Sequence, residues 1–472
     1  METTPHLYEK MTVLENFGHS LKTQSYLYKP ASIREFVRIF ELARRHELKI
    51  TVRGAGRSYN DASLNGGGLV VDMSAMNKVL AWDPATGIIT VEPGLTLEGL
   101  WHVVLPDGWW PPVVSGTMTT TLGGCLATNI HGKNNFRMGP IGEHVLEFNA
   151  LLPTGAQVSC SPTKNADLFY SMISGLGMLG VFTSITLQMK KIHSGLLEVR
   201  GWSVPNLKTH LHDLAENAPN ADYTVGWLDA MAGGRSLGRG QVHVAYYLQE
   251  EEDPHPHETI QVKNQVLPPS IFGMPKGMMH HFMFPFRITT LWAQVNAAKY
   301  LLGVLRREHF RQPHAAFHFL LDYIPNWERA YGRGGLIQHQ SFLPKETAED
   351  AWIEMLKLSH KCRLYSHLGV TKRHRPDKFL LSHAVDGFSL ALDFRVTDGN
   401  RPRLWQMLQD FDKIVVEAGG RFYFAKNSET TPETARRFLG DETIERFKAL
   451  KARTDPHDLL ESDLYRRVFG ET

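Results

Sequence analysis

Histidine, lysine and amide side chains are concentrated at residues 128–135, TNIHGKNN, directly after the glycine pair Gly123-Gly124. A stretch of this composition could form a phosphate-binding loop, a metal site or the floor of an active site. It does not form a P-loop, because the first glycine of that motif would fall on Ala127 and its Mg²⁺-binding hydroxyl on Asn134. The other interpretations depend on the elements that position the stretch.

A second glycine pattern, GLGMLG at residues 175–180, matches the dinucleotide signature G-x-G-x-x-G. Apolar spacing predicts a helix before it at residues 167–173 and a strand after it at residues 181–189. The dinucleotide fold needs the opposite order, with the strand first and the helix last. We therefore interpret this match as a structural turn.

Four further loops are rich in glycine and small polar residues, and each ends or follows an expected strand. They cover residues 54–61, 65–68, 115–124 and 128–135. Such loops offer backbone N–H groups without bulky side chains, so several of them together could wrap the pyrophosphate of an extended dinucleotide. Turns that only connect short strands would have the same composition. The spacing alone leaves both interpretations open.

Patterns that bind metal ions are weak in this chain. Its three cysteines, Cys125, Cys160 and Cys362, have neither disulfide nor zinc-ligand spacing. His255 and His257 could bind a metal, but their acidic, proline-broken stretch EEDPHPHE is more typical of a solvated loop. We expect no metal ion.

The helices and strands that must position these loops differ in length and pattern between the first 191 residues, the middle of the chain and its end. Periodicity and capping patterns predict a helix at residues 33–45, a helix that buries Leu97, Leu100, Trp101 and Val104, and short strands at residues 48–52, 69–71, 79–82 and 88–91. After residue 191, longer alternating strands at residues 242–247 and 388–394 accompany helices at residues 206–215, 346–360 and 403–417. The final residues return to short elements, with a helix that begins at Thr431-Pro432. The pattern predicts an α+β fold whose middle part is a mixed, largely antiparallel sheet covered by helices.

Length and composition restrict the class of protein. With 472 residues, the chain exceeds the roughly 250–300 residues at which a single core stops growing, so we expect two or three structural units. A net charge of +2 without a long basic run argues against a nucleic-acid partner. We recognise neither a signal peptide nor a run of about 18 apolar residues, and therefore expect a cytoplasmic protein that does not span a membrane.

Long ordered motifs carry a family resemblance. The runs VRGAGRSYNDASLNGGGLVVDMSAMNKV, GTMTTTLGGCLATNIHGKNN and GPIGEHV, with LIQHQSFLP, GGRFYFAKNSETT and DPHDLLESDLYRR further on, resemble FAD-linked oxidoreductases of the vanillyl-alcohol-oxidase type. The likeness covers roughly the whole chain and is weakest in the middle. It implies a PCMH-type FAD-binding domain in two parts, at residues 1–192 and 421–472, with a substrate domain at residues 193–420.

The resemblance also implies which residues contact the flavin cofactor. They come from the glycine loops, with one strand residue and one aromatic residue added: Val52, Arg53, Gly54, Ala55, Gly56, Arg57, Ser58, Tyr59, Asn60, Asp61, Ala62, Gly116, Thr121, Leu122, Gly123, Gly124, Thr128, Asn129, Ile130, His131, Val181 and Tyr423.

Arg57 decides how FAD is expected to be held. Many relatives bind FAD covalently through a histidine in a Gly-x-Gly-His-Ser loop, and that position is Arg57 here. Arginine cannot form the histidyl bond, so we expect FAD to be bound non-covalently. His131 stands elsewhere and is expected to be a hydrogen-bonding neighbour of the flavin.

Oxidation of a secondary alcohol requires transfer of a hydride and loss of the hydroxyl proton. The resemblance places Lys133, Lys426 and Tyr59 as catalytic residues and Gln338, Gln340, Ser389 and Ala391 around the substrate. Gln338 and Gln340 lie two apart on an expected strand, so both point to one face. That arrangement suits hydroxyl recognition, although a surface strand would look the same. Ser389 and Ala391 depart from the asparagine and cysteine of the mycobacterial relatives, which leaves the substrate in doubt.

The state of the two lysines remains open. A lysine that acts as a base at pH 7 needs its pKa lowered by about three units, roughly 4 kcal/mol. A charged lysine that binds a phosphate or stabilises an alkoxide needs no such change, and we prefer that role for at least one of the two.

Three functions remain possible. The resemblance implies oxidation of the C2 hydroxyl of a polyprenylphosphoryl-ribose, with a separate short-chain reductase completing an epimerisation. The alternatives are an alditol or aldonolactone oxidase and a non-catalytic flavin module. Residues 272–292, from Phe272 to Trp292, are rich in Met and Phe and could form a lid, a peripheral membrane contact or a buried segment.

Overall fold

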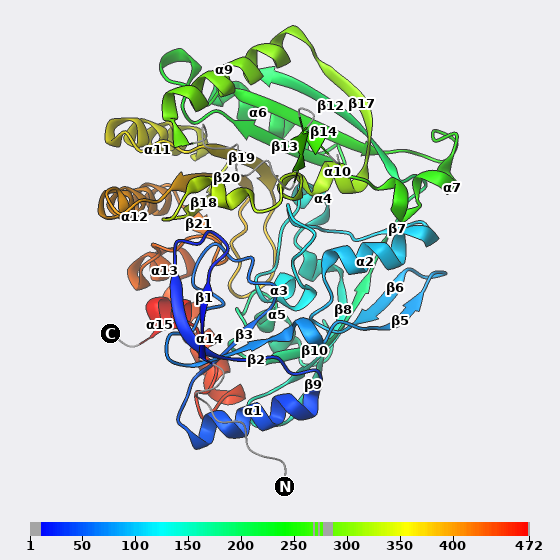
Figure 1. The fold of residues 1–472 in the computed structure, drawn as a ribbon, viewed down its shortest axis with the longest axis vertical. Helices are drawn as coiled ribbons and strands as arrows, with labels where there is room; N and C mark the ends of the chain where they lie inside the picture. The colour runs from blue at the N-terminus through cyan, green and yellow to red at the C-terminus, as the bar shows by residue number, and fades with distance from the viewer. Residues whose placement is uncertain (1–10, 268–269, 272–273, 277–286, 471–472) are drawn as a thin grey trace.

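The structure, a computed structural model, describes residues 11–267, 270–271, 274–276 and 287–470 (Figure 1). A lower part contains the N-terminal elements and the C-terminal helices, and an upper part contains the middle of the chain (Figure 1). This arrangement confirms the predicted α+β class. The proposed boundaries at residues 192/193 and 420/421 stay a prediction.

The first sheet of the lower part carries the first glycine loop. Its strands follow the order β1 (Met11–Glu15), β2 (Lys22–Tyr28), β4 (Leu69–Asp72) and β3 (Ile50–Arg53). Helix α1 (Ile33–Arg45) begins where the Ser32 side chain accepts the Glu35 N–H, as the capping pattern predicted, and buries Phe36 and Phe40. Strand β3 is parallel to β4, so the loop at residues 54–61 leaves the sheet at the carboxyl end of β3.

The second sheet of the lower part is antiparallel. Its strands follow the order β5 (Val79–Asp83), β6 (Ile88–Val91), β10 (Val181–Gln188), β8 (Val145–Leu151) and β9 (Gln157–Cys160). The helices of this region are α2 (Leu97–Val104), α3 (Leu122–Ala127), α4 (Asn135–Met138) and α5 (Ala166–Met172). The glycines of residues 175–180 connect α5 to β10, which confirms that they form a turn and not a dinucleotide-binding loop. Two short strands, β7 (Trp109–Trp110) and β11 (Lys190–Lys191), pair with each other.

The upper part is built on an eight-stranded sheet. Its strands follow the order β17 (Glu308–Pro313), β12 (Leu196–Val204), β14 (Gly240–Tyr247), β13 (Tyr223–Leu228), β19 (Leu368–His374), β20 (Gly387–Arg395), β18 (Leu336–Pro344) and β21 (Arg421–Phe422). We expected a mixed, largely antiparallel sheet, and every pairing between these described strands is antiparallel. Its principal helices are α6 (Leu207–Asn217), α9 (Thr289–Leu305), α11 (Ala348–Cys362) and α12 (Arg401–Glu417) (Figure 1). The shorter elements are α7 (Pro256–Thr259), α10 (His314–His318), β15 (Ser270–Ile271) and β16 (Met274–Pro275).

Strand β18 separates two environments. Its residues from Leu336 to Leu343 are buried, because one face is covered by helices and the other faces the lower part. On the helix side, Ser341 Oγ accepts a hydrogen bond from Trp352 Nε1 of α11 at 3.0 Å. Alternation along the strand directs Gln338 and Gln340 to the opposite side.

The C-terminal segment returns to the first sheet. It contains α13 (Pro432–Leu439), α14 (Asp441–Thr454) and α15 (Asp463–Phe469). Leu460 forms a parallel bridge with Ile50, and Arg467 of α15 makes two hydrogen bonds to Asp61, at 2.9 and 2.6 Å. In Figure 1 α14 and α15, coloured red, lie beside the blue N-terminal elements, so residues far apart in sequence build the same part of the molecule.

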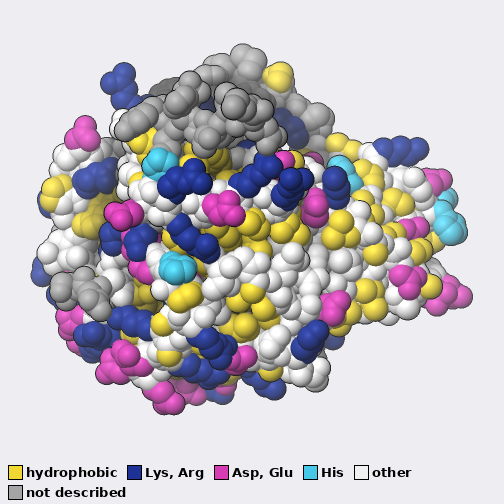
Figure 2. All heavy atoms as spheres, turned by 90° about the horizontal axis from the view of Figure 1, so that it is seen from below, with side chains coloured by type: hydrophobic (Ala, Val, Ile, Leu, Met, Phe, Trp, Pro, Cys, Tyr) yellow, Lys and Arg dark blue, Asp and Glu magenta, His cyan; other side chains and the backbone are white. Residues whose placement is uncertain are grey.

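Among the described residues, no helix is long and apolar enough to cross a bilayer. Most of the stretch at residues 272–292 lies outside the described residues, so the lid, the membrane contact and the buried segment all stay predictions. On the face shown in Figure 2, Lys and Arg side chains lie among Asp and Glu side chains and apolar atoms.

Candidate active site

A cavity of about 510 Å³ lies where the loops of the lower part meet the large sheet. Ligand sites commonly occupy roughly 300–1,000 Å³. Three loops line the cavity from below, and β13, β18, β19 and β20 line it from above. The lining residues of these loops are 54–59, 115–117, 120–121, 128, 130–131 and 133. The glycine loops therefore converge on one site and are more than connections between strands.

Most residues predicted to contact the cofactor line this cavity. They are Val52, Gly54, Ala55, Gly56, Arg57, Ser58, Tyr59, Ala62, Gly116, Thr121, Gly124, Thr128, Ile130, His131 and Tyr423. All the residues predicted for catalysis and substrate binding line it as well: Lys133, Lys426, Gln338, Gln340, Ser389 and Ala391.

Three predicted cofactor residues of the first loop have side chains that serve other contacts. Arg53 donates to the backbone carbonyls of Ser63 and Glu15 at 3.2 and 2.9 Å. Asn60 is fully buried and donates to the Phe424 carbonyl at 2.6 Å, and Asp61 is paired with Arg467. None of the three lines the cavity, because their side chains join the loop to its surroundings.

Four other predicted residues also lie behind the cavity wall. Leu122 and Val181 are buried among apolar side chains. A Cβ added to Gly123 would lie 2.8 Å from the Cβ of Pro93, so this glycine permits close packing. Asn129 has a φ of +48°, and its side-chain oxygen accepts the Gly142 N–H at 3.0 Å. These contacts position the loops from behind.

The first glycine loop suits a pyrophosphate. Within the part of the chain that the structure describes, the backbone N–H groups of residues 55–58 have no acceptor, and these residues line the cavity. Successive unpaired N–H groups of this kind form an anion-binding concavity. A Cβ on Gly54 would lie 2.0 Å from Thr121 Oγ1, so this glycine permits close packing of two loops. Gly56 has a φ of +65°, which favours glycine through the backbone itself. The residues present therefore fit the diphosphate of FAD.

Lys133 is the lysine of residues 128–135, and it lines the cavity. Its Nζ donates to the Phe317 carbonyl and lies 4.2 Å from the centroid of the Phe317 ring. Burial, together with the positive charge of Lys372, lowers the pKa of Lys133 to about 7. The decrease of about three units that a basic lysine requires is thus provided by the cavity.

Lys426 lies over Tyr59, with its Nζ 3.8 Å from the ring centroid. Burial lowers the pKa of Lys426 and raises the pKa of Asp393, while the attraction between these two groups opposes both changes. Burial also raises the pKa of Tyr59, so its hydroxyl remains a hydrogen-bond donor at neutral pH. Gln338 donates to Asp393 and fixes that carboxyl group.

His131 is buried and hydrogen bonded. Its two ring nitrogens face the Gln340 amide at 3.1 Å and Lys372 Nζ at 3.4 Å. Burial holds the pKa of His131 well below its ordinary range, and the nearby cation of Lys372 lowers it further. His131 therefore lines the cavity as a neutral ring, and its predicted hydrogen bond to the flavin stays a prediction. The ring centroid of Tyr423 lies 5.3 Å away.

Sequence reasoning missed several residues of the site. Lys372, Asp393, His318, Lys299 and Trp227 line the cavity, and none was predicted. Alternation was the available signal for Lys372, because residues 368, 370 and 372 of β19 all line the cavity. The same reasoning joins Asp393 to Ser389 and Ala391 on β20. Lys299 and His318 had no signal of this kind.

The charge of the cavity is strongly one-sided. Among the described lining residues, Asp393 is the one carboxylate, whereas five lysine or arginine side chains are present: Arg57, Lys133, Lys299, Lys372 and Lys426. Burial lowers the pKa of Lys299 and of Lys372 to about 8. A site that lowers the pKa of several lysines in this way favours anionic ligands, because an anion compensates the buried positive charge.

Comparison with known proteins agrees with this geometry. Residues 25–161 match the FAD binding domain family. The chain is 31% identical over 430 residues to decaprenylphosphoryl-beta-D-ribose oxidase of Mycolicibacterium smegmatis, covering 89% of each chain. It is also 30% identical over 198 residues to L-gulonolactone oxidase of Mus musculus, covering 42% of this chain and 43% of that relative. A putative D-arabinono-1,4-lactone oxidase of Neurospora crassa matches over 160 residues at 30% identity, covering 34% of this chain and 28% of the relative.

The converging glycine loops, the unpaired N–H groups and these similarities lead to one conclusion. The chain belongs to the FAD-linked oxidoreductases of the vanillyl-alcohol-oxidase type, and it is an FAD-dependent enzyme that oxidises alcohol groups of sugars.

Proposed function

We propose that this enzyme oxidises the C2 hydroxyl of a polyprenylphosphoryl-ribose to the 2-keto form. The observation that carries the proposal is the excess of cationic side chains in the cavity, with Asp393 as the one carboxylate among the described lining residues. A phosphate-bearing sugar compensates that charge, whereas a neutral alditol or lactone does not. The similarity to decaprenylphosphoryl-beta-D-ribose oxidase supports the same substrate class.

Lys133 is our choice for the group that receives the hydroxyl proton. With a pKa of about 7, its amine is substantially neutral at physiological pH and can accept a proton at Nζ. When bound, FAD supplies the acceptor for the hydride that leaves the substrate carbon. Lys372 of β19 and Lys426, which also line the cavity, bind the phosphate or stabilise the developing alkoxide.

The remaining polar side chains position the sugar. Gln338 is held by its hydrogen bond to Asp393, and Gln340 is held by His131, so both amides are fixed before substrate enters. The Tyr59 hydroxyl is available as a donor to a sugar oxygen. Ser389 Oγ is hydrogen bonded to His374 at 2.8 Å, and Ala391 beside it is small, so this wall accommodates a substituent on the ring.

FAD is bound non-covalently in this proposal. Arg57 occupies the position at which covalently flavinylated relatives carry histidine, and its guanidinium lies 5.2 Å from the centroid of the Phe17 ring. Arg57 lines the cavity beside the unpaired N–H groups of its own loop. It therefore adds a positive charge next to the expected pyrophosphate.

The keto sugar is reduced from the opposite face by a separate short-chain reductase in this scheme, which completes an epimerisation. The alternative is an alditol or aldonolactone oxidase. Its support is the similarity to L-gulonolactone oxidase over 42% of the chain. The two functions differ in whether the substrate carries a phosphate.

Anaerobic reduction of the bound flavin distinguishes these functions. Purified protein is mixed with polyprenylphosphoryl-ribose, with free ribose or with an aldonolactone, and bleaching of the flavin absorbance is followed. We expect rapid bleaching with the phosphorylated lipid alone, and a rate that rises with pH through about 7 as Lys133 loses its proton. Faster bleaching by the free lactone would favour the alternative. Flavin that remains with the protein pellet after acid precipitation would contradict non-covalent binding.

A further inference from the structure

Three potential ligand atoms are buried together on the side of β18 that faces the helices. His339 of β18, Asp412 of α12 and Glu429 of the segment before α13 place one nitrogen and two carboxylate oxygens within 4.8 Å of one another. His339 Nε2 lies 3.1 Å from an Asp412 oxygen and 3.8 Å from a Glu429 oxygen. Their side chains are 0%, 3% and 0% exposed. We name these three residues the buried triad.

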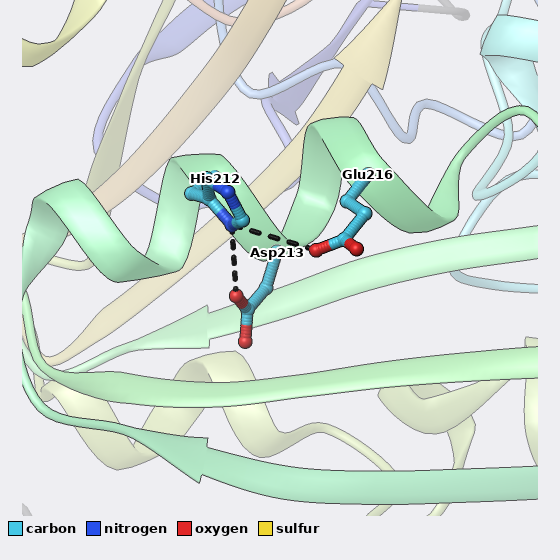
Figure 3. Close-up of side chains that lie close together, drawn as sticks. All are labelled: His212, Asp213 and Glu216. Carbon is cyan, nitrogen blue, oxygen red and sulfur yellow. Dashed lines mark hydrogen bonds and ion pairs between the residues drawn. The ribbon is translucent and has the colours of Figure 1, made fainter.

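A second group of similar composition provides a contrast. His212, Asp213 and Glu216 lie on about one turn of α6, where His212 is paired with both carboxylates (Figure 3). The side chains of His212 and Glu216 are 69% and 71% exposed. Water can solvate His212 and Glu216, and Asp213, 20% exposed, accepts a hydrogen bond from Trp202 Nε1, so this surface group requires no bound ion.

The buried triad has no such solvation. Within the described part of the chain, the second oxygens of Asp412 and Glu429 and the Nδ1 of His339 have no hydrogen-bond partner. The rings of Phe411 and Phe422 lie 5.4 and 5.9 Å from the His339 ring and contribute an apolar wall. A buried carboxylate with only one of its oxygens hydrogen bonded is costly, and in proteins such groups are paired further, protonated or bound to a metal ion.

We propose that His339, Asp412 and Glu429 bind a divalent transition-metal ion such as Zn²⁺. Ligand atoms about 2.1 Å from a tetrahedral ion lie roughly 3.4 Å apart, and the two measured separations from His339 Nε2, 3.1 and 3.8 Å, lie on either side of that value. One His N–H can serve only one of the two carboxylates, whereas one ion serves both. Two carboxylates also neutralise a divalent charge, which leaves the buried group without net charge.

The ion would stabilise the segment that carries catalytic residues. Asn427 donates to Glu429 at 2.9 Å, accepts the Gln340 N–H at 3.2 Å, and its carbonyl accepts from Asn60 at 3.3 Å. Tyr423 and Lys426, on the same segment, line the cavity. The metal is therefore structural, and it positions the substrate-binding wall from behind.

The test is the metal content of the FAD-containing protein, produced in medium supplemented with zinc and measured by plasma mass spectrometry after gel filtration. We expect about one Zn²⁺ per chain. Asp412→Asn and Glu429→Gln should each reduce the content at least fivefold. The matched control is Glu216→Gln on the exposed group, which should leave the metal content unchanged. Protein produced with cobalt should show the visible bands of a tetrahedral site in the wild type and in the control.

Folding is monitored separately, because a variant that does not fold would also lose the ion. Wild-type protein treated with a strong chelator should unfold at a lower temperature, and zinc should restore the original value. A folded, flavin-containing wild type with no stoichiometric metal would overturn the proposal and indicate a shared proton in the buried triad. Zinc that is removed without any change in the unfolding temperature would also overturn it, since such an ion is adventitious.

Discussion

Replacement of Lys133 by methionine should stabilise the protein without flavin, although it removes the proposed proton acceptor. The pKa of Lys133 falls from 10.5 to about 7 because the folded protein buries its ammonium group beside Lys372. At about 1.4 kcal/mol per pH unit, that decrease corresponds to about 5 kcal/mol of destabilisation when the lysine is fully charged. Water that enters the empty cavity reduces the cost, and methionine loses the hydrogen bond to Phe317, worth about 1 kcal/mol. We expect a net gain of roughly 1–2 kcal/mol at pH 7.

The sign of the pH dependence follows from the same decrease. Below pH 7 the lysine is charged in both the folded and the unfolded chain, so the full penalty is present. Between pH 7 and 10.5 the unfolded chain binds more protons than the folded one, so the stability of the wild type rises with pH. From pH 7 to 9 the penalty decreases by about 2 kcal/mol, or about 1–2 kcal/mol with cavity water. The advantage of the methionine variant should therefore diminish over this range.

Differential scanning calorimetry of the flavin-free proteins measures this effect. With an unfolding entropy of about 2.1 cal/mol/K per residue, the 472-residue chain has about 1 kcal/mol/K, so 1–2 kcal/mol corresponds to about 1–2 °C. The variant should unfold about 1–2 °C above the wild type at pH 7 and near the wild type at pH 9. Lys263→Met, at an exposed lysine, is the control and should show no such pH dependence. A difference between Lys133→Met and the wild type that is the same at both pH values would refute the reasoning.

Three further substitutions examine other parts of the site. Gly54→Ala should weaken FAD binding by at least about tenfold, or 1.4 kcal/mol, because the new Cβ would lie 2.0 Å from Thr121 Oγ1. Retention of flavin during dialysis measures this affinity, and an unchanged affinity would exclude a close approach of the Gly54 backbone to FAD. Lys426→Met should slow anaerobic flavin reduction by about 10²–10³-fold while the flavin content stays the same, and an unchanged rate would remove Lys426 from catalysis. Asp61→Asn should lower the unfolding temperature by about 1–3 °C, because it removes the negative charge that strengthens the two hydrogen bonds from Arg467. Each charge-assisted bond of this kind contributes about 1.5–3 kcal/mol. Calorimetry that shows no change would mean that α15 is held by other contacts.

Features determined by local interactions could be predicted from the sequence. The cap at Ser32 and the apolar spacing after it define α1 without any distant contact. The order of elements around residues 175–180 excluded a dinucleotide loop for the same reason. The glycine loops could be identified as loops, but their convergence depends on strand pairing, which the spacing could not reveal. The family resemblance supplied that missing step.

Residues of the upper sheet were predicted less completely. Lys372 and Asp393 reach the cavity because β19 and β20 are paired in register, with Leu368 opposite Asp393 and Lys372 opposite Ser389. Without that register, an isolated lysine on a strand has the pattern of a solvent-facing residue. Lys299 is still harder to predict from the sequence, because it reaches the cavity from α9, far from the other site residues in the chain.

On strand β18, the sequence allowed a role to be predicted for the residues of one face and for none of the residues of the other. Gln338 and Gln340 were assigned to the substrate because two amides on one face suit hydroxyl recognition, and the residue between them, His339, was left without a role. Its partners, Asp412 and Glu429, come from α12 and from the segment before α13, so the sequence offers no spacing that joins them. Yet Asn427 connects Glu429 to the backbone of Gln340. A change in the buried triad must therefore shift the strand whose other face lines the cavity, and substitutions behind β18 should alter substrate binding without touching the substrate.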